Sequence, residues 1–173
     1  MEIGLRFYRS LTDSRMKQMS IIIGIDPGLK GGIAVLESDS KKIIRLDDMP
    51  VSPDGKKQKV NGYGLLKIFG GFTRDTVEMV YLERVGARPG QGVVSMFSFG
   101  RSYGAVEATV SLLGLPLTYV TPQSWKRRAG LVGAEKDASR GKVLDLYPDA
   151  DVARKKDNGR ADAVLIARYG ESA

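Results

Sequence analysis

Residues 21–28 read Ile-Ile-Ile-Gly-Ile-Asp-Pro-Gly, and residues 31–36 continue as Gly-Gly-Ile-Ala-Val-Leu. The continuous apolar run predicts a strand buried on both faces, and the Pro-Gly turn with the second apolar run predicts a β-hairpin. The first strand ends at Asp26, which is its one polar residue. A carboxylate at this place binds a hard cation, stabilises the turn, or is costly to bury. Further carboxylates elsewhere in the chain are needed to decide between these roles.

Composition restricts the chemistry that the chain can perform. A length of 173 residues predicts one domain, and 42% hydrophobic with 27% charged residues is ordinary for a globular protein. Cys 0 and His 0 exclude disulfides, thiolate nucleophiles, zinc–cysteine sites and a Ser-His-Asp triad. Carboxylates and lysines remain, and oxygen ligands favour Mg²⁺ or Mn²⁺. The net charge of +7 favours a polyanionic partner, and no apolar run is long enough to span a membrane.

Hydrophobic periodicity and turn residues predict an α/β domain at residues 19–173. We expect residues 1–18 to be a leader or a disordered extension, because they are polar and of mixed charge. The predicted order is three strands, a short helix, a strand, a long helix, a strand and then helices, which indicates a five-stranded mixed sheet with helices on both faces. Strands are expected at 21–25, 31–36, 42–46, 77–82 and 117–120; helices after Asn61, at 93–113, after Thr121, at 134–146 and at 159–169; and loops at 51–60, 84–92 and 149–158.

Three carboxylates lie where such a fold concentrates its ligands. Asp26 and Glu83 each end an apolar strand, and Asp162 lies in an apolar stretch of the last helix. Asn158 is four residues before Asp162 and shares its helix face, whereas Asp157 joins them only from the loop before the helix. Taken singly, the three acids also suit a turn former, a salt-bridging strand end and a helix-terminal acid. Together they indicate a hydrolase that cuts phosphodiesters with two metal ions.

These residues resemble the motifs of the RuvC-type Holliday junction resolvases, and the phage and organellar branch of that family in particular. The resemblance covers residues 21–170, including the segments 97–104 and 120–126. It implies an RNase H-like fold and a homodimer that resolves four-way DNA junctions in recombination and repair. It also implies hydrolysis that uses Mg²⁺ or Mn²⁺, with two ions in each active site.

The resemblance assigns roles residue by residue. Asp26, Glu83 and Asp162 match three of the family's catalytic metal ligands. Gly159 stands where many relatives have the fourth ligand, so we assign that role to Asp157, with Asn158 as the alternative. Lys136 matches a catalytic lysine beside the scissile phosphate. Some relatives have a base-stacking aromatic residue after the strand-end Glu, but this chain has Val85 and Gly86 there, so cleavage preference is not transferred.

Basic clusters supply the expected DNA contacts. The cluster at residues 56–59 is interpreted as a solvated surface. Trp125 is equally suited to the core or to base stacking, and the apolar residues on more than one face of the helix at 93–113 predict dimerisation through it. The residues assigned to DNA binding are Arg88, Lys126, Arg127, Arg128, Lys155, Lys156 and Arg160.

Two alternative functions stay open. The first is a two-metal nuclease that cuts other branched DNA or RNA–DNA hybrids, and the second is a catalytically dead protein that binds junctions. An ATPase of the actin type also begins with a strand ending in Asp, but its other motifs are missing and the chain is too short. We expect the protein to work in the cytoplasm of a bacterial or phage-infected cell, with an organelle nucleoid as the alternative.

Overall fold

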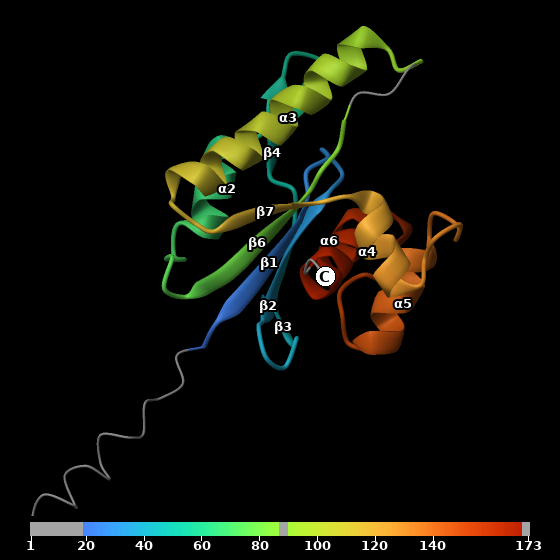
Figure 1. Ribbon diagram of the computed structural model, residues 1–173. Coiled ribbons are helices and arrows are strands. Elements are labelled where there is room, and N and C mark those ends of the chain that lie inside the picture. The colour runs from blue at the N-terminus through green and yellow to red at the C-terminus, as the bar shows by residue number, and fades with distance from the viewer. Residues whose placement is uncertain (1–18, 87–89, 171–173) are drawn as a thin grey trace, which may run out of the picture.

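The computed structural model describes residues 19–86 and 90–170, so the predicted leader at 1–18 and Arg88 lie outside the described residues. A five-stranded sheet has the order β3-β2-β1-β6-β7 (Figure 1). β1 pairs antiparallel with β2 and parallel with β6, while β2–β3 is antiparallel and β6–β7 is parallel. The predicted mixed sheet is therefore confirmed. Its strands are β1 (Ile21–Asp26), β2 (Gly32–Glu37), β3 (Ile43–Asp48), β6 (Val77–Glu83) and β7 (Leu117–Val120).

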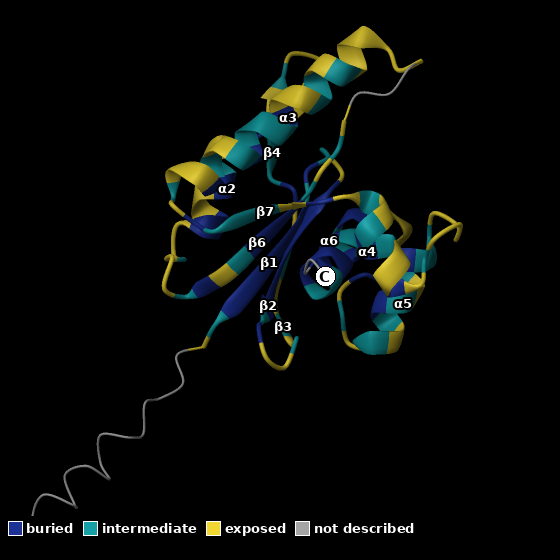
Figure 2. Cartoon of the chain, in the orientation of Figure 1, coloured by how far each residue is buried: buried dark blue, intermediate teal, exposed yellow. Residues whose placement is uncertain are grey.

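Helices cover both faces of this sheet, as the unbroken apolar run of β1 predicts. Ile21, Ile23 and Ile25 pack in one core cluster with residues of α2 (Gly62–Phe69) and α3 (Val93–Leu112). Ile22 packs in a second cluster on the opposite face, with α6 (Asn158–Tyr169) and its neighbours. Figure 2 shows the central strands and α6 as the most buried part of the molecule. None of the helices in the described part of the chain has the length and apolar character needed to cross a membrane.

The predicted loop at 51–60 is wrong, because this segment forms a β-hairpin. β4 (Val51–Asp54) pairs antiparallel with β5 (Lys57–Val60), separate from the main sheet. Gly55 has a φ of 61°, which is the backbone conformation that a two-residue hairpin turn needs at its first central position. Pro53 is tolerated because this ribbon consists of two edge strands. The Asp-Gly turn signal was present in the sequence, but the proline and lysines around it indicated a loop.

The helix predicted at 134–146 begins later than expected. Gly133 has a φ of 75°, and Asp137 precedes α5 (Ala138–Leu146) as its N-terminal capping residue. The preceding helix, α4 (Pro122–Ala129), begins as its Thr-Pro signal predicts, since the Thr121 side chain accepts a hydrogen bond from the Ser124 N–H. A short 3-10 turn, η1 (Lys155–Asp157), interrupts the predicted loop at 149–158 and leads directly into α6.

Glycines allow α6 to pack unusually close to the sheet. A Cβ atom on Gly24 would lie 2.2 Å from the carbonyl oxygen of Ala163 and 2.3 Å from the backbone nitrogen of Ala167. At the start of α6, Gly159 forms a bridge with Gly31, and a Cβ on Gly159 would lie 2.1 Å from the Lys30 carbonyl oxygen. These contacts join the N-terminal turn of α6 to the turn that follows Asp26. The glycines of the first motif thus position the last helix.

Replacing Gly24 with Ala should destabilise the protein by about 3 kcal/mol, because the added methyl group would overlap the backbone of α6. Gly141→Ala is the matched control: a Cβ there has no atom within 4 Å, and alanine favours the interior of α5. Urea unfolding should show a lower midpoint for Gly24→Ala and an equal or higher one for Gly141→Ala. Equal midpoints for Gly24→Ala and the unmodified protein would contradict the close packing of α6.

Candidate active site

Three acidic side chains gather at one edge of the sheet. Ile25 of β1 pairs with Leu82 of the parallel neighbour β6, so Asp26 and Glu83 follow at the same edge. The pKa of Asp26 is raised to about 7, first by burial and then by the charges of Glu83 and Asp162. Asp162 comes from α6, one turn past its start. The structure therefore brings together the three acids that the sequence identified.

The carboxylates form an open cluster centred on Asp26. Within the described residues, no three acidic side chains lie close enough to hold a common metal ion. The chemistry of the donors nevertheless fits a hard divalent cation, because all three are carboxylates and the chain has His 0 and Cys 0. Their mutual repulsion raises the pKa of Asp26, and a bound cation would offset that repulsion.

Neutral donors from three segments hydrogen-bond to the three acids. The Gly28 N–H donates to Asp26 Oδ1 over 3.3 Å. Asp26 therefore also stabilises its turn, which is the role expected of it when it is taken singly. The Trp125 Nε1–H donates to Glu83 Oε1 over 2.8 Å. Burial raises the pKa of Asp162. A hydrogen bond from the Ser139 side chain lowers that pKa by a smaller amount. Sequence reasoning missed Ser139, which carries no motif.

Trp125 belongs to the core. Its side chain is 0% exposed, so it does not offer a surface for base stacking. Its indole nitrogen reaches the active-site edge while its rings pack in the second core cluster with α6. A tryptophan that is buried with its N–H paired is the expected arrangement. It links the position of Glu83 to the packing of α4.

Among the predicted DNA contacts, Lys126 acts electrostatically on the acids. Its positive charge lowers the pKa of both Asp26 and Asp162. Its Nζ atom also lies 5.2 Å from the centre of the Trp125 ring. Lys136, the predicted catalytic lysine, is exposed before α5 and makes no ion pair within the described residues. Of these two lysines, only Lys126 acts on the pKa of the clustered acids.

Asp157 occupies a different environment from the other acids. It is buried, and Arg154 donates to it from Nε over 3.0 Å, from Nη2 over 3.0 Å and from the backbone N–H over 2.9 Å. The Arg154 guanidinium holds the pKa of Asp157 below its usual value. Asn158 accepts from Arg140 Nε over 2.9 Å and donates to Asp137 Oδ1 over 3.1 Å. Both candidates for the fourth ligand are thus held by local partners, and that role stays a prediction.

The predicted DNA-binding cations differ in their surroundings. Arg160 is engaged in ion pairs, with Asp48 at 2.6 Å and Asp151 at 2.6 Å. Arg128 Nη1 donates to the Tyr169 carbonyl oxygen over 3.2 Å. The remaining members of this set in the described chain, apart from Lys126, are exposed: Arg127, Lys155 and Lys156.

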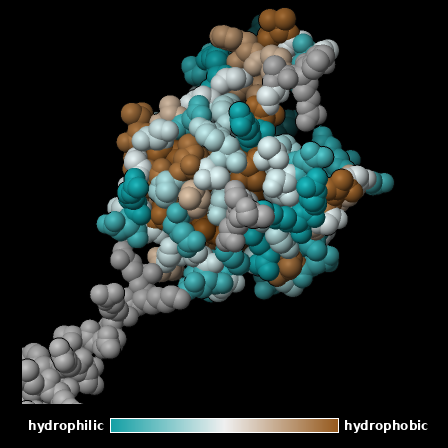
Figure 3. Space-filling model, viewed as in Figure 1, coloured by the Kyte–Doolittle hydropathy of each residue, from teal (hydrophilic) through white to brown (hydrophobic). Residues whose placement is uncertain are grey.

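α3 exposes apolar side chains to solvent. Val93, Val94 and Phe97 at its first turns are 84%, 64% and 68% exposed, and Leu112 at its end is 87% exposed. Figure 3 shows hydrophobic side chains at the tip of the molecule where α3 begins. Such a surface on a monomer is typical of an interaction site.

Comparisons with known proteins support the resemblance seen in the motifs. A stretch of 92 residues, 51% of this chain, is 33% identical to the chloroplastic Holliday junction resolvase MOC1 of Chlamydomonas reinhardtii and spans 10% of that protein. The fold matches that of Thermus thermophilus RuvC in complex with a Holliday junction substrate. That match has a TM-score of 0.62 and 20% identity, and it covers 86% of this chain and 90% of the other.

A second Thermus thermophilus RuvC structure matches with a TM-score of 0.51 and 19% identity, covering 85% of this chain and 90% of that chain. No family model matches the sequence. The predicted RNase H-like fold of the RuvC type is therefore confirmed. The sequence similarity likewise confirms that the chain resembles a Holliday junction resolvase.

The raised pKa of Asp26 predicts how the metal-free protein responds to pH. The folded pKa of about 7 exceeds the ordinary aspartate pKa of 3.8, so the folded state holds the proton more tightly. This contribution to stability is complete below pH 3.8 and is lost as the pH rises through about 7. Asp26→Asn removes this ionisation. The melting temperature of the variant should therefore rise relative to that of the unmodified protein by about 5 °C between pH 5 and pH 8.

Thermal unfolding in a metal chelator measures this difference. Asp75→Asn changes an exposed carboxylate outside the cluster and should give a pH-independent difference. If Asp26→Asn also gives a pH-independent difference, the buried negative cluster is not as described.

Trp125→Phe should weaken metal binding about tenfold, because it removes the donor that orients Glu83 while keeping an aromatic ring in the core. Calorimetric titration with Mn²⁺ measures this effect. Val110→Ala is the control, since it creates a cavity in the core cluster on the other face of the sheet. Both variants should lower the free energy of unfolding, and only Trp125→Phe should lower Mn²⁺ affinity. Equal Mn²⁺ affinity in the two variants would show that the indole contact does not act on the site.

Proposed function

We propose that this chain is a structure-specific endonuclease that resolves four-way DNA junctions by paired, metal-dependent hydrolysis of phosphodiester bonds. The meeting of Asp26, Glu83 and Asp162 at one sheet edge carries this proposal, because it places the acids of the motifs at the ligand-binding edge of an RNase H-like fold. The similarity to an algal Holliday junction resolvase and the fold shared with a RuvC–junction complex support it. The matched stretch spans 10% of the algal protein, so the substrate is inferred for this domain by itself.

The three acids would hold Mg²⁺ or Mn²⁺, with Asp26 in the central position. Two bound ions supply activation of a water molecule and stabilisation of the leaving oxygen. Each of Trp125 and Ser139 engages its acid by a neutral hydrogen bond, so the carboxylate keeps its charge and further lone pairs for a ligand. Lys126 would act as the counter-ion of the acids and bind a non-bridging phosphate oxygen when DNA is present.

The other predicted residues enter the proposal with different support. Asp157 as a fourth ligand requires release from Arg154, and Lys136 as a catalytic lysine requires its exposed chain to turn toward the acids. The exposed cations Arg127, Lys155 and Lys156 are proposed to bind DNA phosphates directly. Arg128 and Arg160 would do so beside their present partners, and Arg88 is proposed from sequence alone.

We infer that the active enzyme is a homodimer. Two opposed cuts in a four-way junction require two active sites, and one chain contains one cluster of the three acids. The exposed apolar residues of α3 at Val93, Val94 and Phe97 supply a surface for self-association. The compartment is proposed as the cytoplasm of a bacterial or phage-infected cell. An organelle is the alternative, and the algal relative is named chloroplastic.

Cleavage of a substrate panel tests the proposal. With Mg²⁺ or Mn²⁺, the protein should nick four-way junctions in symmetrically opposed strands and leave forks, linear duplexes and RNA–DNA hybrids largely uncut. Asp162→Asn should lower cleavage at least about 1,000-fold, because it removes one ligand charge, while junction affinity stays within about threefold of the unmodified protein. Denaturing gels of substrates labelled on each strand measure the cuts, and gel shifts in a metal chelator measure binding.

Other results would select the alternative functions. Equal cutting of forks or hybrids would indicate a two-metal nuclease with a wider substrate range. Tight junction binding without cleavage in either metal would indicate a catalytically dead junction-binding protein, which the engagement of Asp157 by Arg154 gives reason to test. Asp145→Asn, an exposed substitution in α5, is the control and should leave cleavage unchanged.

A further inference from the structure

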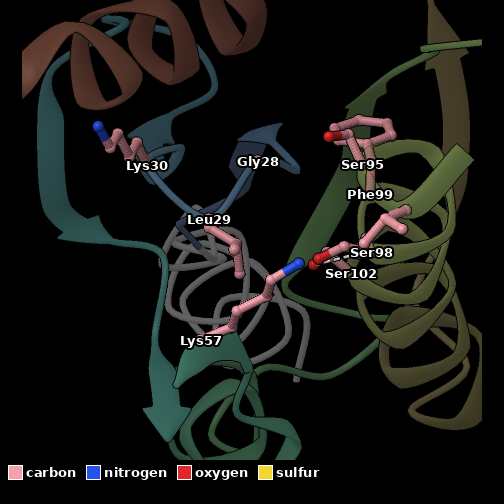
Figure 4. Close-up of a pocket in the computed structure, with 9 residues that line it drawn as sticks. Gly28, Leu29, Lys30, Lys57, Ser95, Ser98, Phe99 and Ser102 are labelled. Atoms are coloured by element: carbon pink, nitrogen blue, oxygen red, sulfur yellow. Dashed lines mark hydrogen bonds between the residues drawn. The ribbon is translucent and has the colours of Figure 1, made fainter. Parts of the chain in front are cut away.

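A cleft of about 420 Å³ opens beside the acidic cluster, on the α3 side of the sheet. It lies between the turn after β1, the β4–β5 hairpin and the first half of α3, and Figure 4 shows these three walls. Its polar groups are lysines and serines, and none of the described residues that line it is a carboxylate. The polar lining consists of Lys30, Lys57, Ser95, Ser98 and Ser102.

The hairpin that carries Lys57 is held firmly against α3. Arg101 of α3 donates from Nη1 to Asp54 Oδ2 over 2.9 Å at the end of β4. Lys59 Nζ lies 3.8 Å from Asp54 Oδ1, and these contacts lower the pKa of that carboxyl. Val60, the last residue of β5, is buried in the same core cluster as Val106 of α3. Lys57 therefore projects from a supported strand and not from the loop that the sequence suggested.

The Lys57 ammonium group points across the cleft toward Ser98 and Ser102 (Figure 4). It makes no ion pair within the described part of the chain, whereas Lys59 on the same ribbon does. Ser102 is buried, and its hydroxyl donates to the Ser98 carbonyl oxygen over 3.1 Å. Lys30 leaves the turn in the other direction. A cation beside serine hydroxyls, without a carboxylate in the same cleft, is suited to an anionic oxygen ligand.

The cleft and the acidic cluster share one backbone segment. Gly28 lines the cleft, and its N–H donates to Asp26 Oδ1. A strand whose phosphate lay at Asp26 would thus have Lys57, on the β4–β5 hairpin across the cleft, as a neighbouring positive charge. The acids lie on one side of this turn, and the cleft with Lys57 lies on the other.

We propose that this cleft binds the phosphodiester backbone of the DNA strand next to the phosphate that is cut, with Lys57 as its principal contact. This inference rests on the proposed function, because it assigns a path to the strand that enters the active site. It gives the hairpin a role in substrate binding, where the sequence alone indicated a solvated basic loop.

Junction binding in a metal chelator tests the role of Lys57 apart from cleavage. Lys57→Ala should weaken junction affinity about fivefold at low salt, and it should reduce the slope of log affinity against log salt by about 0.9, the effect of one lost phosphate contact. Lys56→Ala is the matched control, since it removes the same charge from the turn of the same hairpin but does not line the cleft. Its slope should stay within about 0.3 of the unmodified value.

A thiol-protection experiment gives a second readout. The chain has Cys 0, so Lys57→Cys and Lys56→Cys each carry a single reactive thiol. Bound junction DNA should slow modification of the thiol at position 57 at least about fivefold, and at position 56 less than about twofold, because only the first lies in the cleft. Equal salt slopes and equal protection at both positions would overturn the proposal.

The design separates this inference from the proposed function. If the unmodified protein cuts junctions but the two lysine positions behave alike, the cleft assignment fails and the endonuclease stands. If junctions are not preferred over linear duplex, the same two pairs of variants are compared on duplex DNA, whose backbone presents the same phosphates. A difference at position 57 then supports the cleft without the junction specificity, and an absence of DNA binding overturns both.

Discussion

The close contact between α6 and the first hairpin is the constraint on which the site depends. Gly24, Gly32 and Gly159 lack the Cβ atoms that would collide with the backbone across the contact between the first hairpin and α6. Because these Cβ atoms are absent, the start of α6 crosses directly over the turn after β1. This crossing places Asp162 at the sheet edge that holds Asp26. A methyl group at these points would overlap backbone atoms and displace α6, and Asp162 would move with the helix. These glycines therefore help to set the geometry of the candidate site.

This close packing creates an electrostatic problem that the surrounding residues only partly solve. Three carboxylates meet at the boundary of the core, where burial and mutual repulsion raise the pKa of Asp26. The indole of Trp125 and the hydroxyl of Ser139 add hydrogen bonds without adding charge, and Lys126 is a partial counter-ion. A site that is compensated this incompletely favours a cation when one is available. On the proposed function, the residual repulsion that costs stability in the free protein would be relieved by a bound metal ion.

The sequence predicted those parts of the structure that depend on local pattern. The apolar runs ending in Asp26 and Glu83 predicted two buried strands and, since parallel neighbours end at one edge, the meeting of their acids. The hairpin at 51–60 was missed because its lysines resemble a solvated loop, and the contact that fixes it, Asp54 with Arg101, joins residues far apart in sequence. The partners of Asp157 and the donor to Asp162 were missed for a similar reason. Arg154 competes locally for Asp157, and Ser139 reaches Asp162 only through the packing of α5 on α6.

The positive charge of the chain also depends on contacts between residues far apart in sequence. A net charge of +7 says that a polyanion is attracted, but it does not say where the polyanion lies. Arg160, Arg154 and Arg101 are committed to carboxylates that fix η1, α6 and the β4–β5 hairpin, so their charge is largely used in the fold. Lys126 and Lys57 stand on opposite sides of the turn after β1, the first beside the acids and the second in the cleft. On the proposed function, a DNA strand bound by both lysines would pass over Asp26, so these two cations would select the phosphate that is presented to the acids.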